Sequence, residues 1–227
     1  MFDMPVDITQ YKIATPLPVS LDNPVALEVL GDYALANCPS CVIQLEDGSI
    51  QFTAPTKGAS SKSVHRTRTE WKEVEYWPLL SAPHHWSRQE MTLTKVNSAK
   101  KVVVAQVHVK DATTPPLKVF WNKGKLTIGF RASFDNPEIV NSTILENVPL
   151  GVPFKISVHV TAAGSVSVSA LCQGRKSTCP VLRLDSSWKD RVLQFHGGIY
   201  NQVDYSESTT DEDGSICIIS ELSTTHE

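Results

Sequence analysis

Most of this chain alternates apolar and polar residues with a period of two. The alternation is seen in KVVVAQVHV (101–109), LKVFW (117–121), KLTIGFRA (125–132), FKISVHVT (154–161), SVSVSALC (165–172), RVLQFHGGIYNQV (191–203) and SICIISELS (215–223). This period predicts half-buried β-strands, and the turn signals NKG (122–124), NVPLGVP (147–153) and AAG (162–164) separate them. Many short strands joined by Gly- and Pro-containing turns favour an all-β sandwich or jelly roll.

One domain spanning residues 1–227 is expected, because single β-sandwich domains reach this length and no repeat or linker divides the chain. Only NPVALEVLG (23–31) predicts a helix. Asn23 can cap this helix, Pro24 suits its first turn and Gly31 can end it. Residues 54–63 and 206–215 are predicted to form long loops within the same domain.

Charge and hydropathy exclude several classes of partner. A formal net charge of −3 argues against a general nucleic-acid-binding protein, which would be basic overall. No run of about 18 apolar residues is present, so no membrane partner is expected. No signal peptide is visible in the sequence. We nevertheless expect a secreted or periplasmic protein that is a monomer.

Five cysteines leave several alternatives open. The motif CPSC (38–41) fits a redox pair, half a zinc site or a small disulfide. No second pair has zinc-like spacing, so no metal site is predicted. A disulfide between Cys172 and Cys179 would close a hairpin and would suit an oxidising compartment. The acidic residues 211–213 are predicted to lie in a solvated loop rather than to bind calcium.

The stretch QFHGGIYNQ (194–202) carries unusual side chains for a strand. Side chains alternate between the two faces of a strand, so His196, Gly198, Tyr200 and Gln202 share one face while the other is mostly apolar. A solvated face usually carries Lys, Glu, Ser or Thr instead. This row therefore predicts contact with a ligand.

The segment HRTRTEWKE (65–73) places Arg66, Arg68, Glu70 and Lys72 on one face. Lys57 and Lys62 add to the basic residues before it, and Glu70 is the one acidic residue from 57 to 72. A local basic excess in an acidic protein suits an anionic ligand.

In AQVHV (105–109), Gln106 and His108 share a face within an otherwise apolar strand. A polar pair is costly against a core without partners but sensible in the lining of a cleft. These three segments, in this order, resemble the signature segments of polysaccharide lyase family 7, the alginate lyases. The family segments run approximately R-S/T-E-L-R, Q-I/V-H and Y-F-K-A-G-x-Y-x-Q.

The resemblance extends from about residue 5 to the C-terminus and includes PLGVPF (149–154) and ISELS (219–223). It implies a single β-jelly roll, a concanavalin-like sandwich of two antiparallel sheets, with a substrate groove across the concave sheet. It implies an anionic polysaccharide as partner, and we expect neither a cofactor nor a metal.

Four positions depart from the family pattern. His196 stands where the family usually has Lys, Gln194 where it has Tyr, Trp71 where it has Leu, and Lys72 where it has Arg. The resemblance places sugar contacts at 196 and 72. These departures therefore bear on substrate preference more than on reaction type.

The resemblance implies β-elimination, in which a base removes the C5 proton of a uronic acid and an acid protonates the departing O4. Arg68 can grip the sugar carboxylate with two parallel bonds, and Gln106 can donate an amide hydrogen to it. His108 is expected as base, and Tyr200, whose phenol is protonated at neutral pH, as acid. The resemblance further implies that Tyr acts as base on mannuronate-type sugars and His on guluronate-type sugars.

Further residues are expected to bind substrate: Arg66, Glu70, Lys72, Lys118, His196 and Gln202. Gly198 is expected to let the sugars lie close to the backbone. His84 and His85 are predicted to be loop residues rather than a metal pair.

The leading hypothesis from the sequence is an alginate lyase. Two alternatives remain open: a lyase for another polyuronate such as glucuronan, and a non-catalytic carbohydrate-binding β-sandwich. The apparent acid–base pair at His108 and Tyr200 argues against the second, because binding alone requires no such pair.

Overall fold

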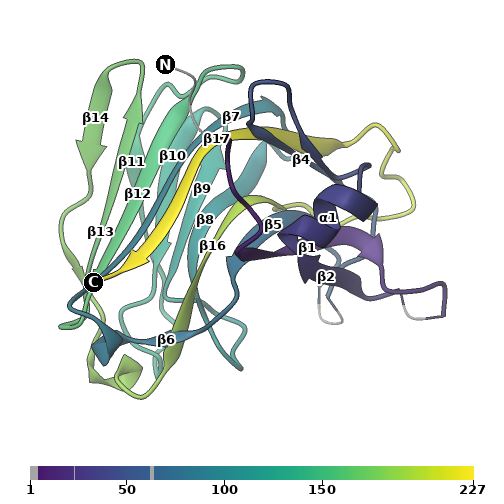
Figure 1. The fold of residues 1–227 in the computed structure, drawn as a ribbon. Coiled ribbons are helices and arrows are strands. Elements are labelled where there is room, and N and C mark those ends of the chain that lie inside the picture. The colour runs from purple at the N-terminus through teal and green to yellow at the C-terminus, as the bar shows by residue number, and fades with distance from the viewer. Residues whose placement is uncertain (1–4, 23, 62–63) are drawn as a thin grey trace.

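Two antiparallel sheets form the body of the computed structural model, which describes residues 5–22, 24–61 and 64–227 (Figure 1). The first sheet has the order β11-β10-β9-β8-β16-β5-β1-β2, with β6 paired to β16. Its strands are β1 (Tyr11–Pro18), β2 (Ala26–Leu30), β5 (Arg68–Glu73), β6 (Trp77–Pro78), β8 (Lys101–Val109), β9 (Leu117–Asn122), β10 (Lys125–Phe130), β11 (Val140–Leu145) and β16 (Val192–Asn201). We call it the groove sheet.

The second sheet has the order β14-β13-β12-β7-β17-β4-β3, with β15 paired to β13. Its strands are β3 (Val42–Gln44), β4 (Ile50–Pro55), β7 (His84–Lys95), β12 (Phe154–Thr161), β13 (Ser165–Cys172), β14 (Arg175–Thr178), β15 (Leu182–Arg183) and β17 (Gly214–His226). We call it the outer sheet. The helices are α1 (Gly31–Asn37) and the 3-10 turns η1 (Leu79–Ser81) and η2 (Ser186–Trp188).

The hairpin of β12 and β13 shows how the sequence sets the sandwich. Phe154 lies opposite Cys172 and Val158 opposite Val168, and buried residues alternate with half-buried ones along both strands. The turn between them contains Gly164 at φ 78°, a conformation that glycine adopts without strain. Both strands have the predicted boundaries.

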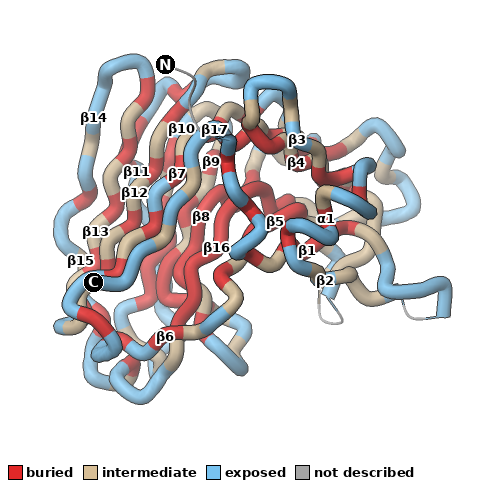
Figure 2. Tube along the Cα trace, in the orientation of Figure 1, coloured by how far each residue is buried: buried red, intermediate tan, exposed pale blue. Residues whose placement is uncertain are grey.

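Each of the seven predicted strands is present, and the predicted all-β class with two antiparallel sheets is confirmed. The apolar faces of both sheets contribute to one cluster of buried residues, in which Phe52, Trp71 and Phe154 are at most 1% exposed. Figure 2 shows this burial along the central strands β8 and β16. The burial of these apolar side chains is the main stabilising contribution to the sandwich.

The helix predicted over residues 23–31 is wrong. Residues 26–30 form β2, which pairs with β1 so that Ile13 lies opposite Val29, and α1 begins at Gly31 instead of ending there. Asn23 lies outside the described residues. Strand pairing overrides the local helix signal here. Gly31 is required for packing, because a Cβ there would lie 1.9 Å from the Ile8 carbonyl oxygen.

His84 and His85 were predicted to be loop residues, but they begin β7. Their side chains diverge, since His85 is fully buried and His84 is exposed. Among the described residues, no group of three or more His, Cys, Asp or Glu side chains is arranged to hold a metal ion.

The cysteines are all free and buried, so the disulfide considered between Cys172 and Cys179 is absent. Cys172 pairs with Arg175 across the hairpin, whereas the Cys179 amide donates to the Val168 carbonyl. In the CPSC motif, burial raises the pKa of Cys41 to about 12. A thiol that stays protonated is a poor redox group.

Within the described part of the chain, no helix has both the length and the hydrophobicity of a membrane span.

Candidate active site in the groove

Three neighbouring strands of the groove sheet carry the three sequence segments singled out above. β16 lies between β5 and β8, so residues distant in sequence become cross-strand neighbours. Tyr200 pairs with Arg68, and Gln194 pairs with His108. His196 pairs with a residue on each side, Lys72 on β5 and Gln106 on β8. Cross-strand neighbours of this kind have side chains close enough to interact.

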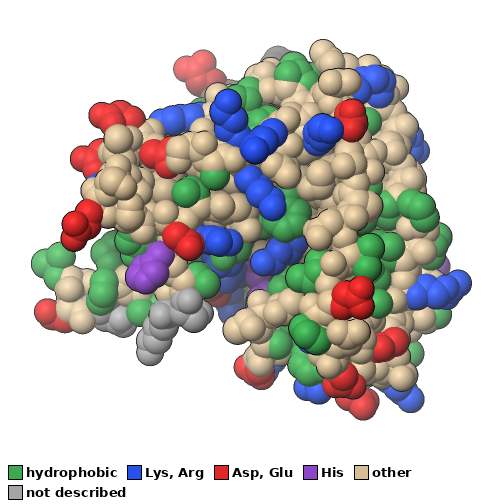
Figure 3. All heavy atoms as spheres, turned by 180° about the vertical axis from the view of Figure 1, so that it is seen from behind, with side chains coloured by type: hydrophobic (Ala, Val, Ile, Leu, Met, Phe, Trp, Pro, Cys, Tyr) green, Lys and Arg blue, Asp and Glu red, His purple; other side chains and the backbone are tan. Residues whose placement is uncertain are grey.

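Four of the predicted site residues line one cavity of about 330 Å³, namely Arg68, Lys72, His108 and Tyr200. The loop segments 59–61 and 112–113 form part of its wall. Figure 3 shows this face of the molecule, where Lys and Arg side chains gather around a hollow in which histidine atoms are visible. The cavity thus combines cations, an imidazole and a phenol.

The Arg68 guanidinium stacks on the Tyr200 ring, with 3.7 Å between its central carbon and the ring centroid. Lys118 approaches the same ring, its Nζ lying 5.7 Å from the centroid. Burial lowers the pKa of Lys118, which makes this lysine easier to deprotonate than a surface lysine.

Glu70, Gln106 and His196 form a buried network beneath the cavity, with exposed fractions of 1%, 3% and 2%. Gln106 Nε2 lies 2.5 Å from Glu70 Oε1 and 3.4 Å from His196 Nδ1. Arg68 Nη1 donates to Glu70 Oε2 at 3.2 Å. Neither Glu70 nor His196 lines the cavity, contrary to the expectation that they contact substrate, and their hydrogen bonds instead suit support of the residues above them.

The network has distinctive electrostatics. Burial alone would raise the pKa of Glu70, but the Arg68 and Lys72 cations hold that pKa below its usual range. Burial lowers the pKa of His196. Burial, together with the neighbouring His196, also lowers the pKa of His108 to about 3. Glu70 is therefore ionised at neutral pH, and both imidazoles are neutral.

The remaining predicted residues lie around this centre and are paired. Lys72 Nζ contacts Glu28 Oε2 at 2.6 Å. Arg66 contacts Asp204 at 2.7 Å, and its Nη1 donates to Gln202 Oε1 at 3.4 Å. Arg66 is partly exposed, with 37% of its side-chain surface accessible. Arg66 and Gln202 do not line the cavity around Tyr200, whereas Lys72 and Glu28 do.

Gly198 was predicted to let sugars lie close to the backbone, but it faces the core instead of the cavity. It has φ 109°, and a Cβ at this position would lie 2.8 Å from the Thr69 carbonyl oxygen and 3.0 Å from the Phe52 ring on the outer sheet. The register between β16 and β8 shifts between Gly197 and Tyr200. Gly198 therefore permits this irregularity against the core, and the bulge leaves Tyr200 in the cavity wall.

Sequence reasoning missed two polar residues of the site. Glu28 lines the cavity, but the mistaken helix over 23–31 hid its place on an edge strand beside β1. Gln194 is 3% exposed and hydrogen-bonds to His196. The sequence did show that position 194 departs from the family pattern, but it did not show that this side chain points toward the interior.

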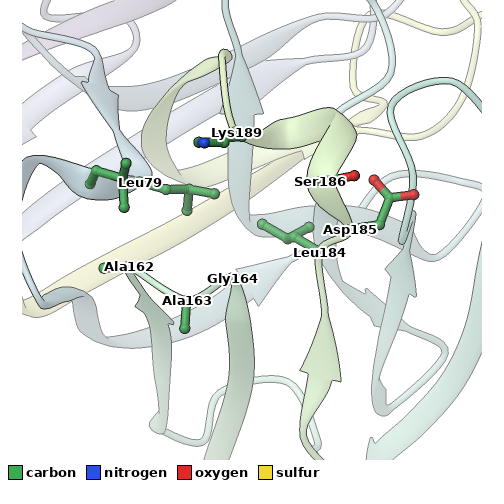
Figure 4. A pocket seen from close by; sticks show the side chains of 9 residues that line it. Leu79, Ala162, Ala163, Gly164, Leu184, Asp185, Ser186 and Lys189 are labelled. Carbon is green, nitrogen blue, oxygen red and sulfur yellow. The ribbon is translucent and has the colours of Figure 1, made fainter.

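Another hollow lies where η1, the β12–β13 turn and the segment after β15 meet (Figure 4). It is lined mainly by small and apolar side chains, with Asp185, Ser186 and Lys189 as its polar members. It contains none of the predicted site residues and offers no comparable acid–base pair.

A family model described as alginate lyase matches residues 6–226. Among solved structures, an alginate lyase of Pseudomonas aeruginosa has a TM-score of 0.81 at 20% identity, covering 97% of this chain and 100% of that chain. An alginate lyase of Klebsiella pneumoniae has a TM-score of 0.80 at 16% identity, covering 97% and 96%. Alginate lyase A1-II', titled a member of polysaccharide lyase family 7, has a TM-score of 0.78 at 20% identity, covering 98% and 96%. The comparison with curated proteins found no significant match.

Proposed function

Because this chain belongs to the alginate lyase family and is a polysaccharide lyase, we propose that it cleaves 1,4-linked polyuronate, foremost alginate, by metal-independent β-elimination. The observation that carries this proposal is the convergence of Arg68, His108 and Tyr200 on one cavity above the buried Gln106. These groups supply the charge, the base and the acid that elimination at an acidic sugar requires.

In the proposed reaction, a base takes the C5 proton, the C4–O4 bond breaks, and a C4–C5 double bond remains on the new non-reducing end. Water is not consumed. The difficulty is that the C5 proton is weakly acidic beside a full carboxylate. Arg68 would stabilise the charge that develops on that carboxylate as the proton leaves, and Gln106 would support Arg68 through their shared partner Glu70.

Tyr200 is the proposed proton donor to O4, and on mannuronate-type sugars it also serves as base. Its ring centroid lies 3.7 Å from the Arg68 guanidinium carbon, so the phenol stands beside the group that would bind the sugar carboxylate. The low pKa of His108 keeps its imidazole neutral but makes it a weaker base. The weakened His108 base supports a preference for mannuronate, on which Tyr200 is the proposed base, over guluronate.

Glucuronan was the alternative suggested by His196 standing where the family has Lys. Since His196 is 2% exposed, its replacement gives no reason to expect a different sugar at the cavity surface. Alginate therefore stays first. Because a charged polymer does not cross a bilayer unaided, the proposed substrate also supports the expected secreted or periplasmic location.

A substrate panel tests the proposal. Purified protein is incubated with polymannuronate, polyguluronate and glucuronan, and the ultraviolet absorbance of the unsaturated sugar is followed with and without a chelator. We expect the fastest rise with polymannuronate and no effect of the chelator. The lyase function would be refuted by the absence of a rise with every polymer.

The same panel addresses the non-catalytic alternative. If wild type and Tyr200→Phe both bind polymer equally and neither produces unsaturated ends, the chain is a carbohydrate-binding protein. Loss of activity on chelation, restored by added metal, would contradict the metal-independent mechanism.

A further inference from the structure

Gln194 and His196 stand on β16 behind the proposed catalytic groups, and the chemistry above assigns them no step. Their side chains are 3% and 2% exposed. Gln194 Nε2 donates to the backbone carbonyl of Glu73, and Gln194 Oε1 lies 2.7 Å from His196 Nε2. Buried polar groups with several partners hold each other in defined orientations.

The donors and acceptors around His196 determine which of its ring nitrogens carries the hydrogen. A backbone carbonyl only accepts hydrogen bonds, so the amide nitrogen of Gln194 must face Glu73 and its oxygen must face His196. That oxygen also only accepts, so His196 Nε2 carries a hydrogen. In a neutral imidazole, the lone pair then lies on Nδ1.

His196 Nδ1 faces the two residues that support the cavity floor. It lies 3.4 Å from Gln106 Nε2 and 3.5 Å from Glu70 Oε2. Gln106 already gives one amide hydrogen to Glu70, so its second hydrogen is available to Nδ1. The other charged or titratable groups that face this imidazole are Arg68 and Lys72 on β5 and His108 on β8, whose ring centroid lies 4.8 Å away.

We propose that His196, held by Gln194 as the Nε2–H tautomer, is a positioning residue that orients the Gln106 amide through its Nδ1 lone pair. This inference rests on the proposed function and deepens it. Gln106 holds Glu70, and Glu70 holds the Arg68 guanidinium that acts on charge developing in the transition state, so a misplaced amide slows turnover more than it weakens binding. The imidazole does not itself touch the sugar.

Two substitutions separate this role from a merely structural one. His196→Asn places a carbonyl oxygen near the Nδ1 position, which keeps an acceptor for Gln106 but loses the bond to Gln194. His196→Gln reaches the Nε2 position, which keeps the bond to Gln194 but loses the acceptor. We expect kcat to fall about tenfold in His196→Gln and at most about threefold in His196→Asn, with KM nearly unchanged in both.

A matched control is His159→Gln, which changes a histidine of the outer sheet that stacks on Trp86. It should leave kcat and KM at wild-type values. Equal losses in His196→Gln and His196→Asn, or a change in KM alone, would overturn the positioning role while leaving the lyase function intact. A wild type that cleaves no polyuronate would refute the proposed function, and this inference with it.

Nitrogen NMR of the histidine side chains tests the tautomer without any activity or variant that must fold. The His196 signal, assigned by its coupling to β16 backbone signals, should show a protonated Nε2 and a bare Nδ1 at neutral pH. A protonated Nδ1 or an imidazolium at that pH would overturn the inference.

Discussion

Two pairs of histidines have nearly the same ring geometry in different surroundings. In the groove pair, His108 and His196, the ring centroids lie 4.8 Å apart at 32°. In the outer pair, His84 and His159, they lie 5.1 Å apart at 34°. The groove pair adjoins the Glu70 carboxylate, two cations and the cavity that Tyr200 lines, whereas the outer pair adjoins Trp86 and the cation Arg88.

The difference shows that neighbours and burial, rather than residue type, distinguish a candidate site. The outer pair is partly solvated, so its hydrogen bond of 3.0 Å competes with water and satisfies only the two rings. The groove pair is embedded in a connected network that reaches Arg68 through Glu70. Substitutions in the groove should therefore change activity, and equivalent ones on the outer sheet should not.

The largest effect is expected from Tyr200→Phe, which removes the proposed proton donor while keeping the ring beneath Arg68. We expect kcat to fall about a thousandfold, within the usual range for loss of a general acid. Tyr33→Phe, which makes the same change on the exposed face of α1, is the control and should be silent. Near-wild-type turnover in Tyr200→Phe, measured by absorbance, would remove Tyr200 from the mechanism.

Next in size is Arg68→Lys, because an ammonium cannot grip a carboxylate with two parallel bonds or stack on a ring as a guanidinium does. We expect kcat/KM to fall about a hundredfold. The outer sheet offers a matched control in Arg88→Lys, since the Arg88 guanidinium carbon lies 4.2 Å from the Trp86 ring centroid. Equal effects of the two changes would mean that Arg68 contributes only packing.

Two glycines extend the comparison of the two sheets to the free energy of unfolding. Gly198→Ala forces a Cβ toward the Thr69 carbonyl at positive φ, whereas Gly174, at φ 74°, has nothing within 4 Å. We expect Gly174→Ala to cost about 1 kcal/mol for backbone strain and Gly198→Ala about 3 kcal/mol, because overpacking adds to that strain. Denaturant unfolding measures both values. Equal costs would show that the core tolerates a side chain at position 198.

The effect that is smallest at neutral pH comes from protonation of a histidine. The folded pKa of His108 is depressed to about 3, below the ordinary 6.5 of the unfolded chain. The unfolded state therefore binds the proton first, and His108 destabilises the fold as pH decreases from 6.5 toward 3. Its contribution to the slope reaches about 1.4 kcal/mol per pH unit.

Substituting His108→Gln should flatten the slope of unfolding free energy against pH below 6.5. His159→Gln should flatten it less, because His159 lies on the solvated outer sheet, where burial that lowers its pKa is less complete. The two slopes are obtained from denaturant unfolding at several pH values. A larger change for His159→Gln would contradict the electrostatic account of the groove pair.

Periodicity alone predicted strands such as β12 and β13, because buried and half-buried residues alternate along them without interruption. It failed where tertiary pairing decides. The segment 26–30 has helix-like residues, yet it pairs with β1. A two-residue period also cannot reveal a bulge, so Gly198 was assigned to the wrong face.

The sequence predicted which residues belong to the candidate site, but it did not predict which of them line the cavity and which are buried beneath it. Three separated segments indicated Arg68, His108 and Tyr200, and these residues line one cavity. That Glu70 and His196 lie beneath it depends on cross-strand contacts that no local pattern encodes. Gln194 was noticed only as a departure from a family pattern, because its partner is a backbone carbonyl on another strand.

The most direct test of the account is to run the wild-type reaction on polymannuronate in water labelled with heavy oxygen and to weigh the products. Elimination predicts products that carry no label, whose masses sum to that of the substrate, each cleavage leaving one unsaturated end. Label in the new ends, with one water added per cleavage, would mean hydrolysis and would contradict the proposed chemistry of the groove.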